Sequence, residues 1–183
     1  MKRTLGLLAM TIASASPGFA ANPTVMVGGQ AMYPSKTIVG NAVNSADHTT
    51  LVAAVKAAGL VDALNGKGPL TVFAPVNSAF AALPAGTVET LVKPENKATL
   101  TKILTYHVVA GDYTTAKLRN LIRADQGTAT LKTLEGEPLT FMVNGPENFV
   151  VKDSKGNVAD IVTYDVRQSN GNIFSIDKIL IPG

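Results

Sequence analysis

The sequence predicts an α+β fold in which a helical N-terminal half packs on an antiparallel, β-rich C-terminal half. Before residue 126, apolar residues recur at helical spacing; after Gln126-Gly127 they alternate with polar residues between short turns. This order of helices followed by strands differs from the strand–helix alternation of a βαβ winding. With 183 residues, the chain is long enough to bury one sizeable core, so one domain is expected.

The start of the chain has the layout of a secretory signal peptide. Lys2 and Arg3 precede an apolar stretch, and small residues end at Ala20, so residues 1–20 are expected to be removed by cleavage near Ala20. No later stretch approaches the roughly 20 apolar residues of a membrane-spanning helix. We therefore expect a secreted or periplasmic protein with no membrane insertion after signal cleavage.

Residues 21–36 contain prolines and glycines without a sustained period, which predicts an N-terminal arm before a domain over 37–183. Removing Lys2 and Arg3 from 16 basic residues leaves 14, against 13 acidic residues, and the lysines are spread along the chain. This distribution argues against a nucleic-acid partner. The absence of cysteine excludes disulfides, thiolate metal ligands and a lipid anchor on cysteine.

The first helices are predicted from their start and stop signals. Asp47 is the expected N-cap of a helix that stops at Gly59, and a short helix over 60–64 follows. Residues 70–75, LTVFAP, read as a strand closed by proline. Asn77 is expected to cap the short helix that comes next.

The strongest helical pattern begins at Pro94. Leu100, Ile103, Leu104 and His107 recur at i, i+3, i+4 and i+7, which places His107 on the buried stripe or just past its end. Another helix is expected over 116–122. Strands are then expected in five segments with alternating polarity: 128–134, 138–145, 148–153, 157–166 and 172–181.

No residue pattern requires an enzyme. There is no G-x-S-x-G motif and no cysteine nucleophile. His48 follows the expected helix cap and is predicted to be a solvated first-turn residue. The two histidines lie far apart without an H-x-x-x-H pair, so no metal or other cofactor is predicted. Asp160, Asp165 and Asp177 are predicted to be outward-facing strand carboxylates and not acid–base pairs.

Three blocks of sequence carry a family resemblance. They are TVFAPVNSAF at 71–80, with Thr71 and Asn77; the Tyr106-His107 pair after an amphipathic helix; and NGNIFSIDKILIP at 170–182, with Asn170, Gly171 and Asp177. Together they resemble the fasciclin (FAS1) domain, in the right order and over most of the chain. Val76 and Phe174 depart from the residues common in that family.

The resemblance implies a FAS1-type wedge in a single-domain secreted bacterial protein of adhesive and non-catalytic function. In animal relatives, adhesion is attributed to the Tyr-His region and to an Asp-Ile pair, which aligns here with Asp165-Val166. Tyr106, Asp165 and Val166 are therefore expected to form an interaction site. The implied partner is a cell-surface or extracellular protein or polysaccharide.

The residues themselves distinguish the members of the Tyr-His pair. A buried His107 needs partners for its ring N–H groups, so a structural role is predicted, whereas the amphipathic phenol of Tyr106 suits an exposed contact. The alternative function is a periplasmic small-ligand-binding protein, or an undetected hydrolase, with its site in a cleft between the helical and β halves. An exposed apolar patch would favour the interaction module, and a concave pocket would favour the ligand binder.

Overall fold

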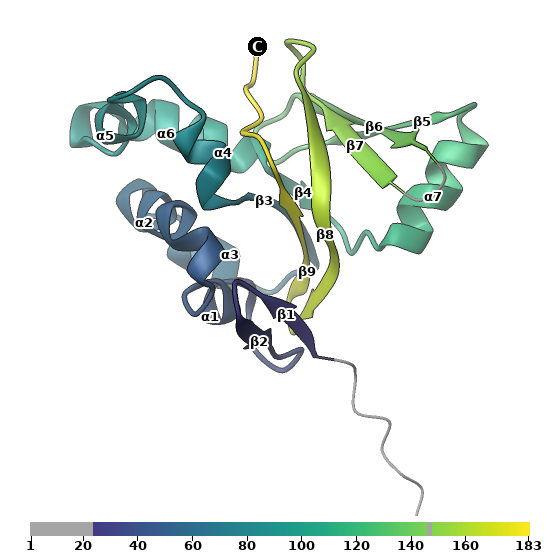
Figure 1. Cartoon of the computed structure of the whole chain (residues 1–183), viewed down its shortest axis with the longest axis horizontal. Helices are drawn as coiled ribbons and strands as arrows, with labels where there is room; N and C mark the ends of the chain where they lie inside the picture. The colour runs from purple at the N-terminus through teal and green to yellow at the C-terminus, as the bar shows by residue number, and fades with distance from the viewer. Residues whose placement is uncertain (1–23, 146–147) are drawn as a thin grey trace, which may run out of the picture.

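The computed structural model describes residues 24–145 and 148–183 (Figure 1). The predicted signal peptide lies outside these residues. The α-helices are α1 (Ile38–Ala42), α2 (Thr49–Ala58), α3 (Val61–Asn65), α4 (Asn77–Ala81), α5 (Thr87–Leu91), α6 (Lys97–Tyr106) and α7 (Thr115–Ala124). Two 3-10 turns precede α2 and α6: η1 (Ala46–His48) and η2 (Pro94–Asn96).

The strands are β1 (Val25–Val27), β2 (Gln30–Met32), β3 (Leu70–Pro75), β4 (Val108–Ala110), β5 (Thr128–Lys132), β6 (Pro138–Asn144), β7 (Asn148–Lys152), β8 (Val158–Gln168) and β9 (Gly171–Ile176). Helices thus precede most of the strands, and the α+β class is as predicted. The last predicted strand ends early: the chain from 179 to 183 has no regular structure.

The predicted N-terminal arm is part of the packed fold. β1 and β2 form an antiparallel hairpin, with Val25 opposite Met32, turned by Gly28 and Gly29 at positive φ. Val27 and Met32 are buried among the residues that α1 and α2 also bury. Strands of three residues are too short to show an alternating pattern, so no strand was predicted here.

Seven strands form one sheet in the order β4-β3-β9-β8-β7-β6-β5. Every pairing is antiparallel except β3 with β9, which places strands from opposite ends of the domain side by side. The sheet also curls back on itself. Val109 of β4 forms an antiparallel bridge with Thr133, and the N–H of Leu134 donates to the Val108 carbonyl at 2.7 Å.

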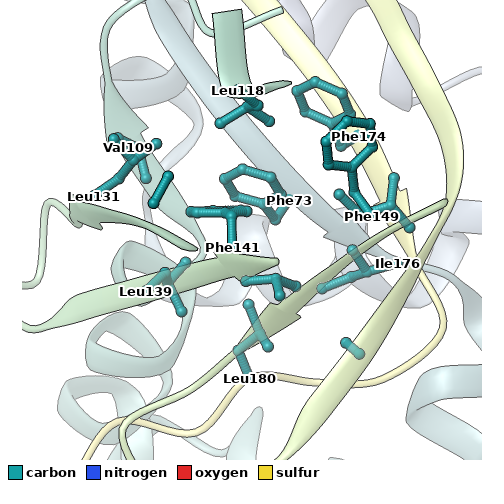
Figure 2. Packing of buried hydrophobic residues seen from close by; sticks show 14 of the residues in the cluster. Phe73, Val109, Leu118, Leu131, Leu139, Phe141, Phe149, Phe174, Ile176 and Leu180 are labelled. Carbon is teal, nitrogen blue, oxygen red and sulfur yellow. The ribbon is translucent and has the colours of Figure 1, made fainter. Parts of the chain in front are cut away.

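This curvature gives two separate apolar cores. Inside the curl, Phe73 stacks on Phe174 at 5.5 Å between ring centroids and contacts Phe141 at 4.9 Å (Figure 2). Helix α7 contributes Leu118 and Ile122 to this core. The second core lies between helices α1, α2, α3 and α6 and the opposite face of the sheet. Both faces of β3 are therefore covered, which explains why LTVFAP is apolar at nearly every position.

Asn77 stabilises a helix start, but not that of its own helix. Its Oδ1 accepts from the Thr50 N–H at 3.1 Å in the first turn of α2, and its Nδ2 donates to the Ala46 carbonyl at 2.8 Å. The predicted N-cap role of Asp47 is wrong, because the turn η1 moves the start of α2 to Thr49 and leaves His48 at the N-cap, where its side chain makes no capping hydrogen bond. A residue 27 positions away supplies the missing acceptor.

We expect Asn77→Ala to lower the free energy of unfolding by about 1 to 2 kcal/mol, because it leaves an N–H in α2 and a carbonyl in η1 without partners. Urea denaturation measures the change. Ser78→Ala is the matched control, since Ser78 is exposed on the same helix, and it should stay within about 0.5 kcal/mol of the parent. Equal effects of the two substitutions would contradict the capping role.

Candidate functional site

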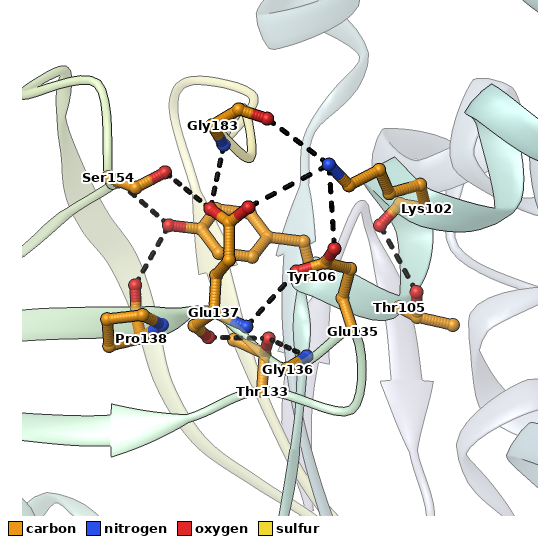
Figure 3. Close-up of polar contacts among 10 residues, drawn as sticks. All are labelled: Lys102, Thr105, Tyr106, Thr133, Glu135, Gly136, Glu137, Pro138, Ser154 and Gly183. Atoms are coloured by element: carbon orange, nitrogen blue, oxygen red, sulfur yellow. Dashed lines mark hydrogen bonds and ion pairs between the residues drawn. The ribbon is translucent and has the colours of Figure 1, made fainter.

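The Tyr106 side chain lies in the core, so its predicted exposure is wrong. It is 0% exposed, and its hydroxyl donates to the Pro138 carbonyl at 2.9 Å and accepts from the Ser154 N–H at 2.9 Å (Figure 3). Burial raises the pKa of the phenol. Tyr106 is the last residue of α6, and its ring packs in the core inside the sheet. Its hydroxyl hydrogen-bonds two backbone groups of the same chain and is not available to a partner protein.

A polar cluster surrounds this hydroxyl at the surface. The Oε2 atom of Glu137 accepts from the Gly183 N–H at 2.7 Å and from the Ser154 hydroxyl at 2.8 Å, while Lys102 lies 3.7 Å from Oε1 (Figure 3). These contacts, led by the Gly183 N–H, lower the pKa of Glu137. The cluster ties α6, the start of β6, the β7–β8 turn and residue 183 together.

His107 is held in one tautomer by two backbone groups. Its Nδ1 lies 2.8 Å from the Ile103 carbonyl and must donate, whereas its Nε2 accepts from the Leu180 N–H at 3.0 Å. The ring is buried, and desolvation lowers its pKa to about 4. A neutral imidazole therefore joins the end of α6 to the chain after β9, as a structural residue does.

His48 is buried as well, contrary to the prediction of a solvated residue. Its Nδ1 lies 2.9 Å from the Ser45 hydroxyl and its Nε2 lies 3.2 Å from the Ser175 hydroxyl, and burial lowers its pKa. The turn η1 directs the ring towards β9, which sequence periodicity does not reveal. In the described part of the chain no carboxylate hydrogen-bonds to this ring, and Ser175 is 0% exposed. The arrangement lacks both the orienting acid and the open nucleophile of a hydrolase.

Asp165 sits at an irregular point of β8, where the pairing with β9 shifts register. Its φ is 51°, and its Oδ1 accepts from the Thr115 N–H at 2.9 Å and from Asn172 Nδ2 at 3.0 Å. Aspartate tolerates this left-handed backbone better than most residues. The side chain thus joins the start of α7 to the first part of β9. Its neighbour Val166 is buried in the second core.

We expect Asp165→Ala to lower the free energy of unfolding by about 2 to 3 kcal/mol. The substitution leaves two donors, the Thr115 N–H and Asn172 Nδ2, without an acceptor and places alanine at positive φ. Asp165→Asn keeps the acceptor oxygen and a residue that tolerates this backbone, so it should cost less than about 1 kcal/mol. Chemical denaturation of both variants tests the assignment. Near-parent stability of the alanine variant would show that the carboxylate does not hold α7.

Two other motif residues, Thr71 and Asp177, form side-chain hydrogen bonds with backbone groups. The buried Thr71 hydroxyl donates to the Gly111 carbonyl at 2.7 Å and accepts from the Tyr113 N–H at 2.9 Å, which fixes the chain between β4 and α7. Asp177 accepts from the Asp160 N–H at 2.7 Å. Each side chain therefore binds a neighbouring segment of its own chain.

Asn170 and Gly171 join the helical layer to the sheet. Asn170 Oδ1 accepts from the Ile38 N–H at 3.0 Å at the start of α1, and its Nδ2 donates to the Leu64 carbonyl at 2.8 Å at the end of α3. A Cβ at Gly171 would lie 1.9 Å from the Leu70 carbonyl oxygen, so only glycine allows this approach of β9 to β3.

The fold does not bring Tyr106 and Asp165 to one surface. Residues close to them in sequence, Val108 and Val166, instead lie in one row across the sheet, beneath the helices. Val108 pairs with Val72, Val72 with Ile173, and Ile173 with Val166, so these four valine and isoleucine residues form one row across β4, β3, β9 and β8. The row faces α1, α2 and α3. Between it and these helices lies an apolar cavity of about 80 Å³.

Polar side chains also contribute to the wall of this cavity. His48, His107 and Ser175 also line it, and their hydrogen bonds are directed to other protein groups. The cavity wall is therefore apolar in practice. Sequence reasoning expected a cleft between the helical and β halves only as an alternative, and did not identify its residues.

One exposed apolar surface lies on the outer face of the hairpin, which we define as Met26, Ala31 and Tyr33. Other exposed large apolar side chains lie outside the hairpin, namely Val43, Val92, Leu121, Leu134, Val143 and Val162. Met26 is opposite Ala31, and Tyr33 follows two residues later on the same side. Met26 is 61% exposed and Tyr33 48%, and the Lys36 ammonium lies 5.2 Å from the tyrosine ring centroid. The sequence assigned this segment to the arm and gave it no role.

The described residues contain neither a membrane-spanning helix nor a group of metal-binding side chains. No described helix has the length and apolar character to cross a membrane. Residues 24–145 and 148–183 also contain no group of three histidine, cysteine or acidic side chains placed to bind a metal ion.

Comparison with known proteins decides the family. A family model, the fasciclin domain, matches residues 46–182. The chain belongs to the fasciclin (FAS1) domain family. Among its FAS1 relatives, protein sll1483 of Synechocystis is 50% identical over 148 residues, covering 80% of this chain and 73% of the relative.

Two further similarities bear on this FAS1 chain. The cell surface glycolipoprotein MPB83 of Mycobacterium bovis is 36% identical over 170 residues, covering 89% of this chain and 68% of that protein. A solved FAS1 domain pair from the insect cell adhesion molecule fasciclin I superposes with a TM-score of 0.69 at 20% identity. That match covers 80% of this chain and 51% of the insect chain, so the chain spans about half of that protein and the likeness establishes the fold alone.

Proposed function

We propose that this FAS1 chain is an exported, non-catalytic module that binds a protein at a cell surface or in an extracellular matrix. One relative is named a cell surface glycolipoprotein, and the insect protein that shares the fold is named a cell adhesion molecule. FAS1 proteins are in general adhesive and not catalytic.

We propose that binding occurs at the outer face of the hairpin. Tyr106 and Val166 are buried and contribute through the core, whereas Tyr33 and Met26 present large apolar side chains to solvent. Tyrosine combines an apolar ring with a polar tip and is enriched at protein interfaces. The Lys36 ammonium beside the ring would attract and orient an acidic surface of the partner. An apolar face of this kind favours a protein over a polysaccharide.

Binding is tested with beads that carry residues 21–183 and are mixed with cells of the producing organism. We expect attachment that Tyr33→Ala and Met26→Ser each reduce severalfold without changing the melting temperature. Val162→Ser is the matched control, because Val162 is 52% exposed on β8, outside the hairpin. Attachment lost after carbohydrate cleavage but not after protease treatment of the cells would identify a polysaccharide and contradict the protein partner.

Export is tested separately by expressing the full chain and determining the N-terminus of the accumulated protein. We expect a periplasmic or secreted product that begins at Ala21. A cytoplasmic product that retains Met1 would contradict export while leaving the binding experiment unaffected.

A further inference from the structure

We propose that the cavity beneath α1, α2 and α3 binds an aliphatic chain that ends in an anionic head group, as in a fatty acid. Its floor is the row formed by Val108, Val72, Ile173 and Val166, and its roof is the apolar side of three short helices. This role is separate from the surface interaction proposed above, because the cavity wall and the outer face of the hairpin use different side chains.

The histidine side chains in the cavity wall already have hydrogen-bond partners within the protein, so they do not favour a polar ligand. Both ring nitrogens of His107 are engaged by backbone groups, and both of those of His48 by serine hydroxyls. A polar ligand group inside would therefore lose its hydration and find no free partner among these residues, whereas a methylene chain loses nothing. The wall thus selects hydrocarbon.

The volume sets how much of the chain enters. At about 80 Å³, the cavity has roughly half the volume of an engineered 150 Å³ cavity that stays dry and binds benzene or xenon. Only the terminal part of an aliphatic chain fits in it. The remainder must leave past the partly exposed side chains that line the cavity on the helical side, namely Val39 of α1, Val52 of α2 and Val61 of α3.

A cation stands where the head group would emerge. Lys56 lines the cavity from α2, close to Val52 in sequence, and is exposed, so its aliphatic stem lies along the wall while its ammonium reaches solvent. Among the described residues that line the cavity, none is acidic. A carboxylate at the rim would meet this ammonium, whereas a cationic head group would be repelled.

The first test measures binding of saturated carboxylates from six to twelve carbons by calorimetry with residues 21–183. We expect affinity to rise roughly fourfold per added methylene until the cavity is full, because each buried methylene contributes about that factor, and then to level off. An affinity independent of chain length would overturn the proposal. Phosphatidylglycerol vesicles distinguish the source: sedimentation with vesicles but no binding of the free acids would mean a membrane surface and also overturn it.

The second test fills the cavity. Val166→Phe should weaken decanoate binding at least about tenfold, since it removes space for two methylenes, whereas Val162→Phe on the exposed side of β8 should change it less than about twofold. Ala42→Leu, on the partly exposed α1, fills the same cavity with less risk to folding. Parent-like binding by a folded Ala42→Leu or Val166→Phe protein would overturn the site.

The third test concerns the head group. Lys56→Gln should weaken decanoate binding by about two- to fivefold, the range of an exposed ion pair, and leave decanol binding unchanged. Lys97→Gln, an exposed lysine outside the cavity wall, is the control. Equal losses for decanoate and decanol would contradict the role of Lys56. Because bead attachment to cells depends on Tyr33 and not on Val166, failure of either proposal leaves the other testable.

Discussion

Replacing Tyr106 with alanine is expected to lower the free energy of unfolding by about 3 to 5 kcal/mol, the cost of deleting a large buried aromatic side chain. The ring is 0% exposed in the core inside the curled sheet, and its hydroxyl bonds to Pro138 and Ser154. The loss has two parts, a cavity and two unpartnered backbone groups. Equilibrium denaturation in urea measures the total.

Two variants separate these parts. Tyr106→Phe keeps the ring and removes only the hydroxyl, so it should cost about 1 to 2 kcal/mol. Tyr33→Ala removes an exposed tyrosine and should stay within about 0.5 kcal/mol of the parent. If Tyr106→Ala instead left stability unchanged and abolished attachment to cells, Tyr106 would be a contact residue and its place in the core would be refuted.

Acidification from pH 6.5 to 4 is expected to destabilise the protein through His107. Its pKa falls from 6.5 to about 4 on folding because the buried ring cannot be charged without losing hydration. The stability that the neutral ring contributes is therefore fully present above pH 6.5 and is lost as the pH falls towards 4. At about 1.36 kcal/mol per pKa unit, the loss approaches about 3 kcal/mol.

This pH dependence is measured as the urea midpoint at intervals from pH 8 to 4. His107→Gln removes the buried ring and its hydrogen bonds, so the variant should be less stable than the parent at pH 7. Because glutamine cannot titrate, the stability of the variant should fall less steeply below pH 6.5. His48→Gln is the comparison, since burial lowers the pKa of His48 in the same direction. Glu137 acts in a different window, because its lowered pKa makes its contribution disappear only below 4.5. Equal slopes for the parent and His107→Gln would contradict the buried neutral ring.

The fold was largely predictable because its signals are local. The helical spacing before Tyr106, the stop at Gly59 and the alternation after Gly127 each predicted an element that the structure contains. The three short sequence blocks predicted the family that the comparison establishes. These signals left out helices α1 and α5, strand β4 and the hairpin of β1 and β2, whose strands are too short for any period to appear.

The site was less predictable because it depends on contacts between distant segments. The residue type of Tyr106 indicated an amphipathic side chain but not which end faces solvent, and the backbone groups of Pro138 and Ser154 decided that it is buried. His48 was placed in solvent because helical periodicity does not describe the turn η1 that directs it towards Ser175. Both errors concern polar side chains, whose position is set by where a partner lies.

By itself the sequence determined the class of the fold, most of the helices and strands, and the absence of disulfide chemistry, because propensity and periodicity act over a few neighbouring residues. Only the tertiary structure decided that β3 pairs with β9, that Asn77 caps a helix 27 residues away, and that Val108 and Val166 line one cavity. Those features arise when segments distant in sequence compete to bury the same apolar surface and satisfy the same hydrogen bonds, and no local pattern encodes the outcome.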